Sequence, residues 1–217
     1  MIVNLNLQNK TVIVIGGGNE AEKRINSLLK QNCEILVISA SVNPQINKLY
    51  KSNKIKLKKQ KIQDIKFISK FKPHMIITTT NDKKMNQKII NAAKRKKIIA
   101  YSSDNPEDSG FSNPSIIDFD NMIQIAIFTG GQSPAMSKKI KEKLEKALKK
   151  IISKEDIAQI RIQKIARKFA KEFIPSNTQR GECLRKIMSD NEIDQLIKDG
   201  HVKKAEKRAI TILRNWK

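Results

Sequence analysis

Apolar positions in the first half of the chain gather into short runs, separated by polar segments with helical periodicity. The runs are rich in β-branched residues, which suits strands covered on both faces. They lie at Thr11–Ile15, Glu34–Ser39, Lys54–Lys58, His74–Thr79 and Ile98–Ser102. Alternation of such strands with helices is typical of a parallel sheet with helices on its faces. Residues 1–113 are therefore predicted to form an α/β, Rossmann-like parallel sheet domain.

Two helices of this domain stand out in the pattern. One is predicted from Glu20 to about Lys30, directly after the first strand. The clearer one is predicted from Asp82 to Lys96, where apolar residues recur at helical spacing: Met85, Ile89, Ile90 and Ala93.

The pattern changes between residues 114 and 152. Two apolar strands are predicted at Ser115–Phe119 and Met122–Phe128, with Asp120-Asn121 as the hairpin turn between them. A helix from Pro134 to Ile152 follows. An antiparallel hairpin and a helix after a parallel domain suggest a dimerisation segment.

From residue 153 to 217 the pattern is helical throughout. Pro175 and Gly200 interrupt it. Helices are predicted at Glu155–Phe173, Thr178–Met188, Asp190–Asp199 and His201–Trp216. This small C-terminal domain leaves little room for chemistry of its own, and capping a substrate cleft is one use for it.

The turn after the first strand carries the most informative motif. Gly16, Gly18 and Ala21 form G-x-G-x-x-A between a buried strand and a helix start. In dinucleotide-binding folds the first glycine makes the turn, the second leaves room for the pyrophosphate, and the third small residue lets helix and strand pack closely. The helix N-terminus then attracts the phosphates. A glycine turn that only packs a helix is the alternative.

Ligands of such sheets bind beyond the carboxyl ends of the strands. Ala40-Ser41 follows the second strand with neither an acidic residue nor a nearby arginine, so the choice between NAD and NADP stays open and the missing arginine favours NAD. The stretch Thr78–Asp82 supplies hydroxyl and N–H groups, or simply a helix cap at Asn81 or Asp82. Asp104 places a carboxylate after the fifth strand, where a plain turn residue is the alternative.

A second glycine turn precedes the helix of the middle segment. Thr129-Gly130-Gly131 leads into Ser133, a predicted cap, and Pro134 at the first helical position. Glycines before a helix N-terminus again predict an anion site.

Charge narrows the choice of ligands. The chain has 44 Lys and Arg against 21 Asp and Glu, a formal charge of +23, which attracts polyanions. Nucleic acid, an acidic membrane surface and a small substrate with many carboxylates all qualify. Aromatic residues make up 5% of the chain and no zinc-finger or RNP signature appears, so we expect no specific nucleic-acid binding. A lysine-rich composition that decorates solvated surfaces is the alternative explanation.

Other residue classes restrict the chemistry further. Cys33 and Cys183 form neither a C-x-x-C motif nor a disulfide framework, which fits a reducing cytoplasm. His74 and His201 are not at ligand spacing, so we expect no metal site. No run is apolar enough to span a bilayer, and we expect no membrane association.

Several of these motifs, taken in order, resemble one family. They are Leu5-x-Leu7, the run from Gly16 to Arg24, Thr78–Asp82, Asp104-Asn105-Pro106, Asn113–Asp118 and Thr129–Pro134. Together they resemble the precorrin-2 dehydrogenase/sirohydrochlorin ferrochelatase family, the amino-terminal module of siroheme synthase, over residues 1 to about 150. The resemblance implies NAD-dependent oxidation of precorrin-2 to sirohydrochlorin in a homodimer that pairs through the middle segment.

The resemblance also assigns roles to residues. It places the catalytic carboxylate at Asp104. Ser102-Ser103 departs from the family, where valines are common, and we expect this to change packing more than chemistry. Nucleotide contacts fall on Gly16, Gly18, Asn19, Glu20, Ala40 and Ser41, with Thr79 and Thr80 beside them, and substrate contacts on Thr129, Gly130, Gly131 and Ser133.

The implied chemistry agrees with the residues. Precorrin-2 carries eight carboxylates, which a basic cleft and a helix-end anion site would orient against the nicotinamide. Asp104 would then be the general base. Two alternatives stay open: an enzyme that also inserts ferrous iron into sirohydrochlorin, of which we expect little or no activity, and a non-catalytic module that binds NAD(H) or a polyanion.

Overall fold

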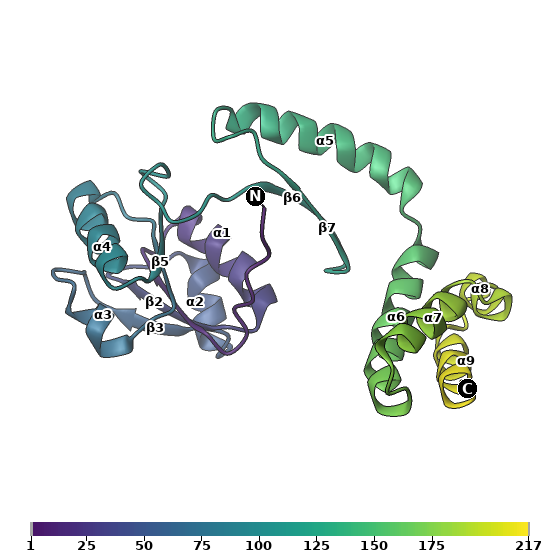
Figure 1. Cartoon of the computed structure of the whole chain (residues 1–217). Helices are drawn as coiled ribbons and strands as arrows, with labels where there is room; N and C mark the ends of the chain where they lie inside the picture. The colour runs from purple at the N-terminus through teal and green to yellow at the C-terminus, as the bar shows by residue number, and fades with distance from the viewer. Residues whose placement is uncertain (1, 217) are drawn as a thin grey trace. The chain divides into compact units, whose positions relative to one another are not determined.

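Within residues 2–216, which the computed structural model describes, the first part of the chain forms a five-stranded parallel sheet in the order β3-β2-β1-β4-β5 (Figure 1). Met1 and Lys217, the outer ends of the expected first and last domains, lie outside these residues. The strands are β1 (Thr11–Ile15), β2 (Glu34–Ser39), β3 (Lys56–Lys59), β4 (Met75–Thr78) and β5 (Ile99–Ser102). The predicted Rossmann-like class is confirmed.

Helices cover both faces of this sheet. Their bounds are α1 (Asn19–Leu28) with a 3₁₀ turn at Leu29–Gln31, α2 (Pro44–Lys51), α3 (Lys66–Phe71) and α4 (Lys83–Arg95). Val12 and Val14 of β1 pack with Ile25 of α1 on one face, whereas Ile13 packs with Ile89 of α4 on the other. The side chains of a strand alternate between faces, and both faces of β1 are buried, which explains its continuous apolar run.

The chain divides into two compact units, residues 2–113 and 114–216 of the part described. The second unit begins with an antiparallel hairpin of β6 (Ser115–Phe119) and β7 (Ile123–Ile127). Asp120 and Asn121 have positive φ values of 55° and 56°, and the Met122 N–H donates to the Phe119 carbonyl across 2.9 Å, which closes the turn. The predicted hairpin is therefore confirmed.

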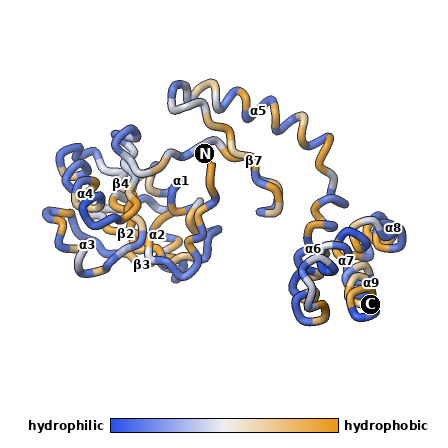
Figure 2. Tube along the Cα trace, in the orientation of Figure 1, coloured by the Kyte–Doolittle hydropathy of each residue, from blue (hydrophilic) through white to orange (hydrophobic). Residues whose placement is uncertain are grey.

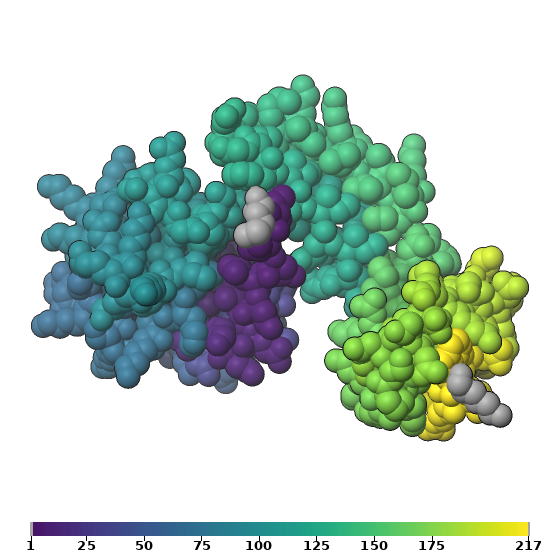
Figure 3. All heavy atoms as spheres, viewed as in Figure 1, coloured from purple at the N-terminus to yellow at the C-terminus, as the bar shows by residue number. Residues whose placement is uncertain are grey.

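Helix α5 (Pro134–Ile151) follows the hairpin and contacts both of its strands. Ser137 is its one buried residue, and all residues of α5 are described. Figure 2 shows apolar segments recurring between polar ones along α5, and Figure 3 shows side chains projecting from it. A long helix with so little buried surface has an apolar side that the described residues leave uncovered.

The C-terminal helices pack around their own core. They are α6 (Lys154–Phe173), α7 (Asn177–Met188), α8 (Asn191–Lys198) and α9 (Val202–Arg214). Ile162 of α6, Ile187 of α7 and Ile193 of α8 are fully buried in this core. The small residues Ala166, Ala205 and Ala209, also buried there, allow close helix approach. The all-helical character of this region is confirmed.

Candidate functional site

The glycine turn after β1 is pressed against two neighbouring loops. Gly16 has a φ of +119°, which glycine adopts at little cost, and a Cβ on it would lie 2.3 Å from Thr79 Oγ1. A Cβ on Gly17 would lie 2.1 Å from the carbonyl oxygen of Ser41. The backbone N–H of Asn43 also donates to the Gly17 carbonyl across 2.9 Å. Gly17, a variable position in the G-x-G-x-x-A pattern, is therefore as constrained as Gly16.

Gly18 differs because it faces open space at the start of α1. Its backbone is extended, with φ −89° and ψ −168°, and a Cβ there would meet nothing within 4 Å. Within the part of the chain that the structure describes, no side chain caps α1, so the N–H groups of its first turn are not taken by a capping oxygen. Asn19, the first helical residue, is exposed. Open space beside uncapped N–H groups is the arrangement that a diphosphate requires.

The Glu20 carboxylate is engaged within α1. It accepts a hydrogen bond from the Arg24 guanidinium and lies 3.5 Å from the Lys23 ammonium. Arg24 in turn donates to the Tyr101 hydroxyl across 3.3 Å, and its guanidinium carbon lies 4.9 Å from the centre of that ring. This pairing compensates a negative charge near the helix start that would otherwise repel phosphate.

Ala40 and Ser41 lie in an exposed loop at the end of β2. The Ser39 hydroxyl donates to the Ser41 carbonyl across 2.6 Å, and Asn43 then caps α2 through the N–H of Ile46. The loop is therefore ordered by its own hydrogen bonds beside the glycine turn.

Thr79 and Thr80 lie in the loop between β4 and α4. The Thr79 hydroxyl donates to the Ile15 carbonyl across 2.9 Å, which ties this loop to the end of β1. The Thr80 hydroxyl donates to the side-chain oxygen of Asn86 across 2.6 Å. Asp82 accepts from the N–H of Met85, so the helix-cap interpretation of this stretch is confirmed at Asp82.

Asp104 follows β5 in an exposed position, yet buried side chains hold its carboxylate. Asn86, which is 1% exposed, donates through Nδ2 to Asp104 Oδ1 across 2.9 Å. Ser102, which is 3% exposed, donates its hydroxyl to the same oxygen across 2.5 Å. Neither Asn86 nor Ser102 was selected from the sequence as a functional residue.

Ser102 and Ser103, expected to change packing more than chemistry, both make hydrogen bonds through their hydroxyls, so their effect on chemistry stays a prediction. Besides bonding Asp104, the Ser102 hydroxyl lies 2.7 Å from the Thr78 hydroxyl. The Ser103 hydroxyl donates to the Thr78 carbonyl across 3.1 Å. Valine at either position would remove these hydrogen bonds, so the serines form part of the polar structure around the carboxylate.

The sheet brings these residues to one edge. Ile15, Thr78 and Ser102 end adjacent strands and lie side by side in the register. The residues that follow them, the glycine turn, the Thr79–Thr80 loop and Asp104, therefore share the carboxyl edge, where parallel sheets bind ligands.

The second glycine turn lies in the other unit. Gly130 and Gly131 have φ values of 65° and 77°, and Ser133 accepts from the N–H of Met136 as predicted for a cap. The Thr129 hydroxyl donates to the Ser133 carbonyl across 3.2 Å and lies 2.8 Å from the Ser137 hydroxyl. The Met136 N–H at the start of α5 is therefore already bonded to Ser133. Substrate contact by this turn stays a prediction.

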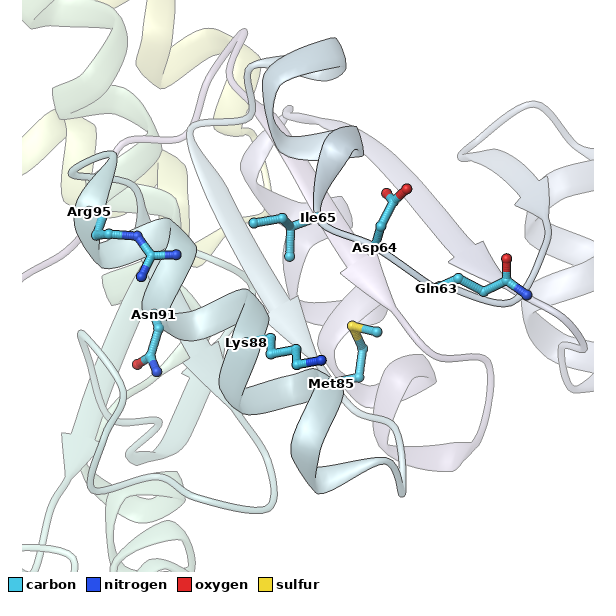
Figure 4. Close-up of a pocket in the computed structure, with 7 residues that line it drawn as sticks. All are labelled: Gln63, Asp64, Ile65, Met85, Lys88, Asn91 and Arg95. Carbon is cyan, nitrogen blue, oxygen red and sulfur yellow. The ribbon is translucent and has the colours of Figure 1, made fainter.

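A hollow of about 420 Å³ lies between the start of α3 and the length of α4 (Figure 4). Lys88 and Arg95 face it from α4, and Asp64 lies across from them. None of the predicted nucleotide contacts lines it. A dinucleotide is expected along the open carboxyl edge of the sheet rather than between two helices, so we do not assign the cofactor to this hollow.

Both cysteines are free thiols. Burial raises the pKa of Cys33 and that of Cys183, which disfavours the thiolate, the reactive form of the side chain. Among residues 2–216, no group of three or more His, Cys, Asp and Glu side chains could hold a metal ion. None of the helices within the same residues is both long enough and apolar enough to cross a membrane.

The sheet order, the glycine turn and the uncapped helix start define a dinucleotide-binding domain of the Rossmann-like class. Comparison with family models agrees: residues 3–115 match a family described as putative NAD(P)-binding, and residues 120–147 match the central region of sirohaem biosynthesis proteins. The chain belongs to the family described as putative NAD(P)-binding, and the resemblance inferred from its motifs is confirmed.

Individual relatives give the same result. A siroheme synthase from Psychromonas ingrahamii is 28% identical over 199 residues, covering 92% of this chain and 40% of that protein. One from Actinobacillus pleuropneumoniae serotype 7 is 25% identical, covering 97% of this chain and 42% of that protein. The chain thus spans less than half the length of these relatives. A solved structure named SirC, precorrin-2 dehydrogenase, shares the fold, with a TM-score of 0.71, 21% identity and coverage of 97% of this chain and 99% of that one.

Proposed function

We propose that this chain oxidises precorrin-2 to sirohydrochlorin with NAD as the hydride acceptor and Asp104 as the general base. The observation that carries the proposal is the Asp104 carboxylate, which two buried side chains hold at the carboxyl edge of the sheet. A carboxylate anchored beside a dinucleotide turn suits a reaction that removes both a hydride and protons. The family match supports the same chemistry.

The residues at this edge fit the cofactor. Uncapped N–H groups of α1 and the open space over Gly18 would receive the diphosphate. Gly16 and Gly18 would approach it with their backbone, Asn19 and Glu20 would flank it, Ala40 and Ser41 would lie toward the adenosine end, and Thr79 and Thr80 toward the nicotinamide. When bound, NAD supplies the carbon that accepts the hydride.

We propose NAD rather than NADP because Ala40-Ser41 carries no arginine to meet a 2′-phosphate. One observation favours NADP: Lys59 of β3 pairs with Ser39 in the sheet register, which brings a cation to the same edge. Titration of the protein with both cofactors decides between them. We expect tighter binding of NAD; tighter binding of NADP that Lys59→Ala removes would reverse the assignment.

In this proposal Asp104 accepts a proton from a ring carbon of precorrin-2 as conjugation extends. The substrate carboxylates would be oriented by the basic surface of the chain and by the turn formed by Thr129, Gly130, Gly131 and Ser133. A charge of +23 favours the capture of a substrate with eight carboxylates. Asp104 would then act on a substrate that is already positioned.

We also propose that two copies pair through the middle segment. A two-stranded hairpin is marginally stable alone, and α5 leaves Met136, Leu144 and Ile151 exposed at 46%, 38% and 71%. A second copy would cover these residues. Free Cys33 and Cys183 fit a reducing cytoplasm as the site of the reaction.

The test is Asp104→Asn in an assay that follows the absorbance change after adding NAD and freshly made precorrin-2. Asparagine keeps the size of the side chain and can accept from Ser102, but it cannot take up a proton. We expect a loss of at least about 100-fold in kcat, with NAD affinity unchanged, because general-base catalysis contributes about 10²- to 10⁴-fold. Turnover equal to that of the unmodified protein would remove Asp104 as the base. No oxidation by the unmodified protein, with NAD bound, would favour a non-catalytic binding module.

A further inference from the structure

The hydrogen bonds around Asp104 have a fixed direction. The Ser102 hydroxyl has one proton, which it donates to Asp104 Oδ1. In the 2.7 Å contact between the hydroxyls of Thr78 and Ser102, Thr78 must therefore be the donor. Thr78 is fully buried. The hydrogen bonds therefore run from Thr78 to Ser102 and from Ser102 to one carboxylate oxygen, Asp104 Oδ1.

Asn86 is locked in the same way. Its Nδ2 donates to the Thr80 carbonyl across 2.8 Å and to Asp104 Oδ1 across 2.9 Å, which uses both of its protons. Its side-chain oxygen accepts from the Thr80 hydroxyl across 2.6 Å. The reverse orientation of the amide would face a carbonyl with an oxygen, so Thr80 determines which end of the Asn86 side chain meets Asp104.

Both donors thus fall on Oδ1. Among residues 2–216, Asp104 Oδ2 has no hydrogen-bond partner, and the Asp104 side chain is exposed. An oxygen that already accepts two hydrogen bonds from buried groups is a poor proton acceptor, because protonation would set its new hydrogen against both donors. Oδ2 accepts neither of these hydrogen bonds, so a proton added to it would not face a donor.

We propose that Ser102 and Asn86 are positioning residues that anchor Oδ1 and leave Oδ2 as the atom that accepts the substrate proton. This inference rests on the proposed role of Asp104 as the base. The Asp104 carboxylate is thus held by Ser102 at the end of β5 as well as by Asn86 of α4.

The first test is Ser102→Ala, measured in the precorrin-2 assay with saturating NAD. Removing one donor leaves the carboxylate free to rotate, so we expect kcat to fall about tenfold, with KM and NAD affinity unchanged, since a misplaced reacting group affects the chemical step. Ser102→Thr restores the hydroxyl and should recover most of kcat. If Ser102 only supported the fold, its loss would not lower kcat at an unchanged KM, and Ser102→Thr would not recover kcat.

Ser109→Ala is the matched control. Ser109 accepts from the N–H of Ser102 across 2.9 Å and donates to the Asn105 carbonyl, so it supports the same loop without touching Asp104. We expect a lower Tm and an unchanged kcat. An equal loss of kcat in Ser109→Ala and Ser102→Ala would overturn the proposal.

Asn86→Asp provides a second test that keeps the size of the side chain. It replaces a donor with a carboxylate 2.9 Å from Oδ1, so we expect a larger loss of kcat, about 100-fold, because like charges at this distance cannot both remain ionised. Asn91→Asp, an exposed position on the same helix, is its control and should keep full kcat.

The outcomes separate this inference from the proposed function. Wild-type kcat in both Ser102→Ala and Asn86→Asp, with Asp104→Asn inactive, would overturn the positioning role and keep Asp104 as the base. An unmodified protein without precorrin-2 oxidation would instead overturn the function.

Discussion

Gly17 and Ser41 meet so closely that a Cβ on Gly17 would lie 2.1 Å from the Ser41 carbonyl oxygen. The same Cβ would lie 2.9 Å from the Ser39 hydroxyl and from the Val42 Cα. The loops after β1 and β2 thus contact each other through a glycine with no room for a side chain. This contact keeps the adenosine side of the proposed cofactor site against the glycine turn.

Gly17→Ala should therefore destabilise the first unit. Backbone atoms of the second loop must move to admit the methyl group, and overpacking of this kind costs about 1–3 kcal/mol. We expect Tm to fall by about 2–4 °C for each kcal/mol lost. Thermal unfolding followed by circular dichroism measures this change, and a Tm equal to that of the unmodified protein would show that the loop after β2 adapts freely.

Gly18→Ala should leave the stability of the first unit unchanged, unlike Gly17→Ala, and should instead weaken NAD binding. Its φ of −89° suits alanine and no atom lies within 4 Å of the new Cβ, so we expect Tm to stay within about 2 °C. The methyl group would occupy the space proposed for the diphosphate, so NAD affinity should fall at least tenfold, measured by titration calorimetry. Unchanged affinity would mean that the diphosphate does not pass over Gly18.

Much of the fold could be predicted because the strong apolar runs coincide with buried strands. The bounds of β1 and β2 match the prediction to the residue, since both strands carry a continuous run of at least four apolar, mostly β-branched residues. The edge strand was predicted at Lys54–Lys58 and is found at Lys56–Lys59, because alternating lysines give a weak periodic signal at a solvated edge. The first helix was predicted to about Lys30, whereas its α-helical part ends at Leu28.

The site was predictable in part. Asp104 was identified because a carboxylate after a strand of a parallel sheet reaches the ligand edge. Its partners were missed for a physical reason: Ser102 and Asn86 act through side-chain contacts between neighbouring elements, which depend on strand order and helix rotation. A buried asparagine within an amphipathic helix was the one local signal for Asn86. Gly17 was missed because the dinucleotide motif treats its position as variable.

The start of α6 gives a pH-dependent prediction. Ser153 and Asp156 form a capping box, and hydrogen bonds from the Ser153 N–H and hydroxyl lower the pKa of Asp156 below its ordinary value of 3.8. A lowered pKa means that the bonds stabilise the ionised form. Their contribution is therefore complete above the ordinary value and is lost as pH falls through the lowered one.

Ser153→Ala should accordingly cost about 1 kcal/mol at pH 7, as loss of a serine cap typically does. The difference in unfolding free energy between Ser153→Ala and the unmodified protein should shrink below about pH 4, as Asp156 becomes protonated. Urea unfolding at a series of pH values measures it. A difference that grows in acid would contradict the capping box as its source.

The apolar side of α5 gives the last prediction. Met136, Leu144 and Ile151 are exposed, and partly buried Ile140 and Leu148 lie at helical spacing between them. Residues at i, i+4, i+8, i+12 and i+15 form one stripe along a helix, and a stripe of this length is usually covered. We expect it to be the centre of the contact between two copies.

Leu144→Asp places a charge in the middle of this stripe. Burying a leucine contributes about 1.5–3 kcal/mol and each 1.4 kcal/mol is tenfold in affinity, so the dimer dissociation constant should rise at least tenfold. Sedimentation equilibrium over a concentration series measures it. Lys146→Asp is the matched control. Lys146 lies about 200° around the helix from Leu144, and its replacement changes the charge more than Leu144→Asp does, yet it should leave the dimer intact. A dimer of unchanged affinity in Leu144→Asp would place the contact between copies elsewhere, and a monomer at all concentrations in the unmodified protein would exclude pairing altogether.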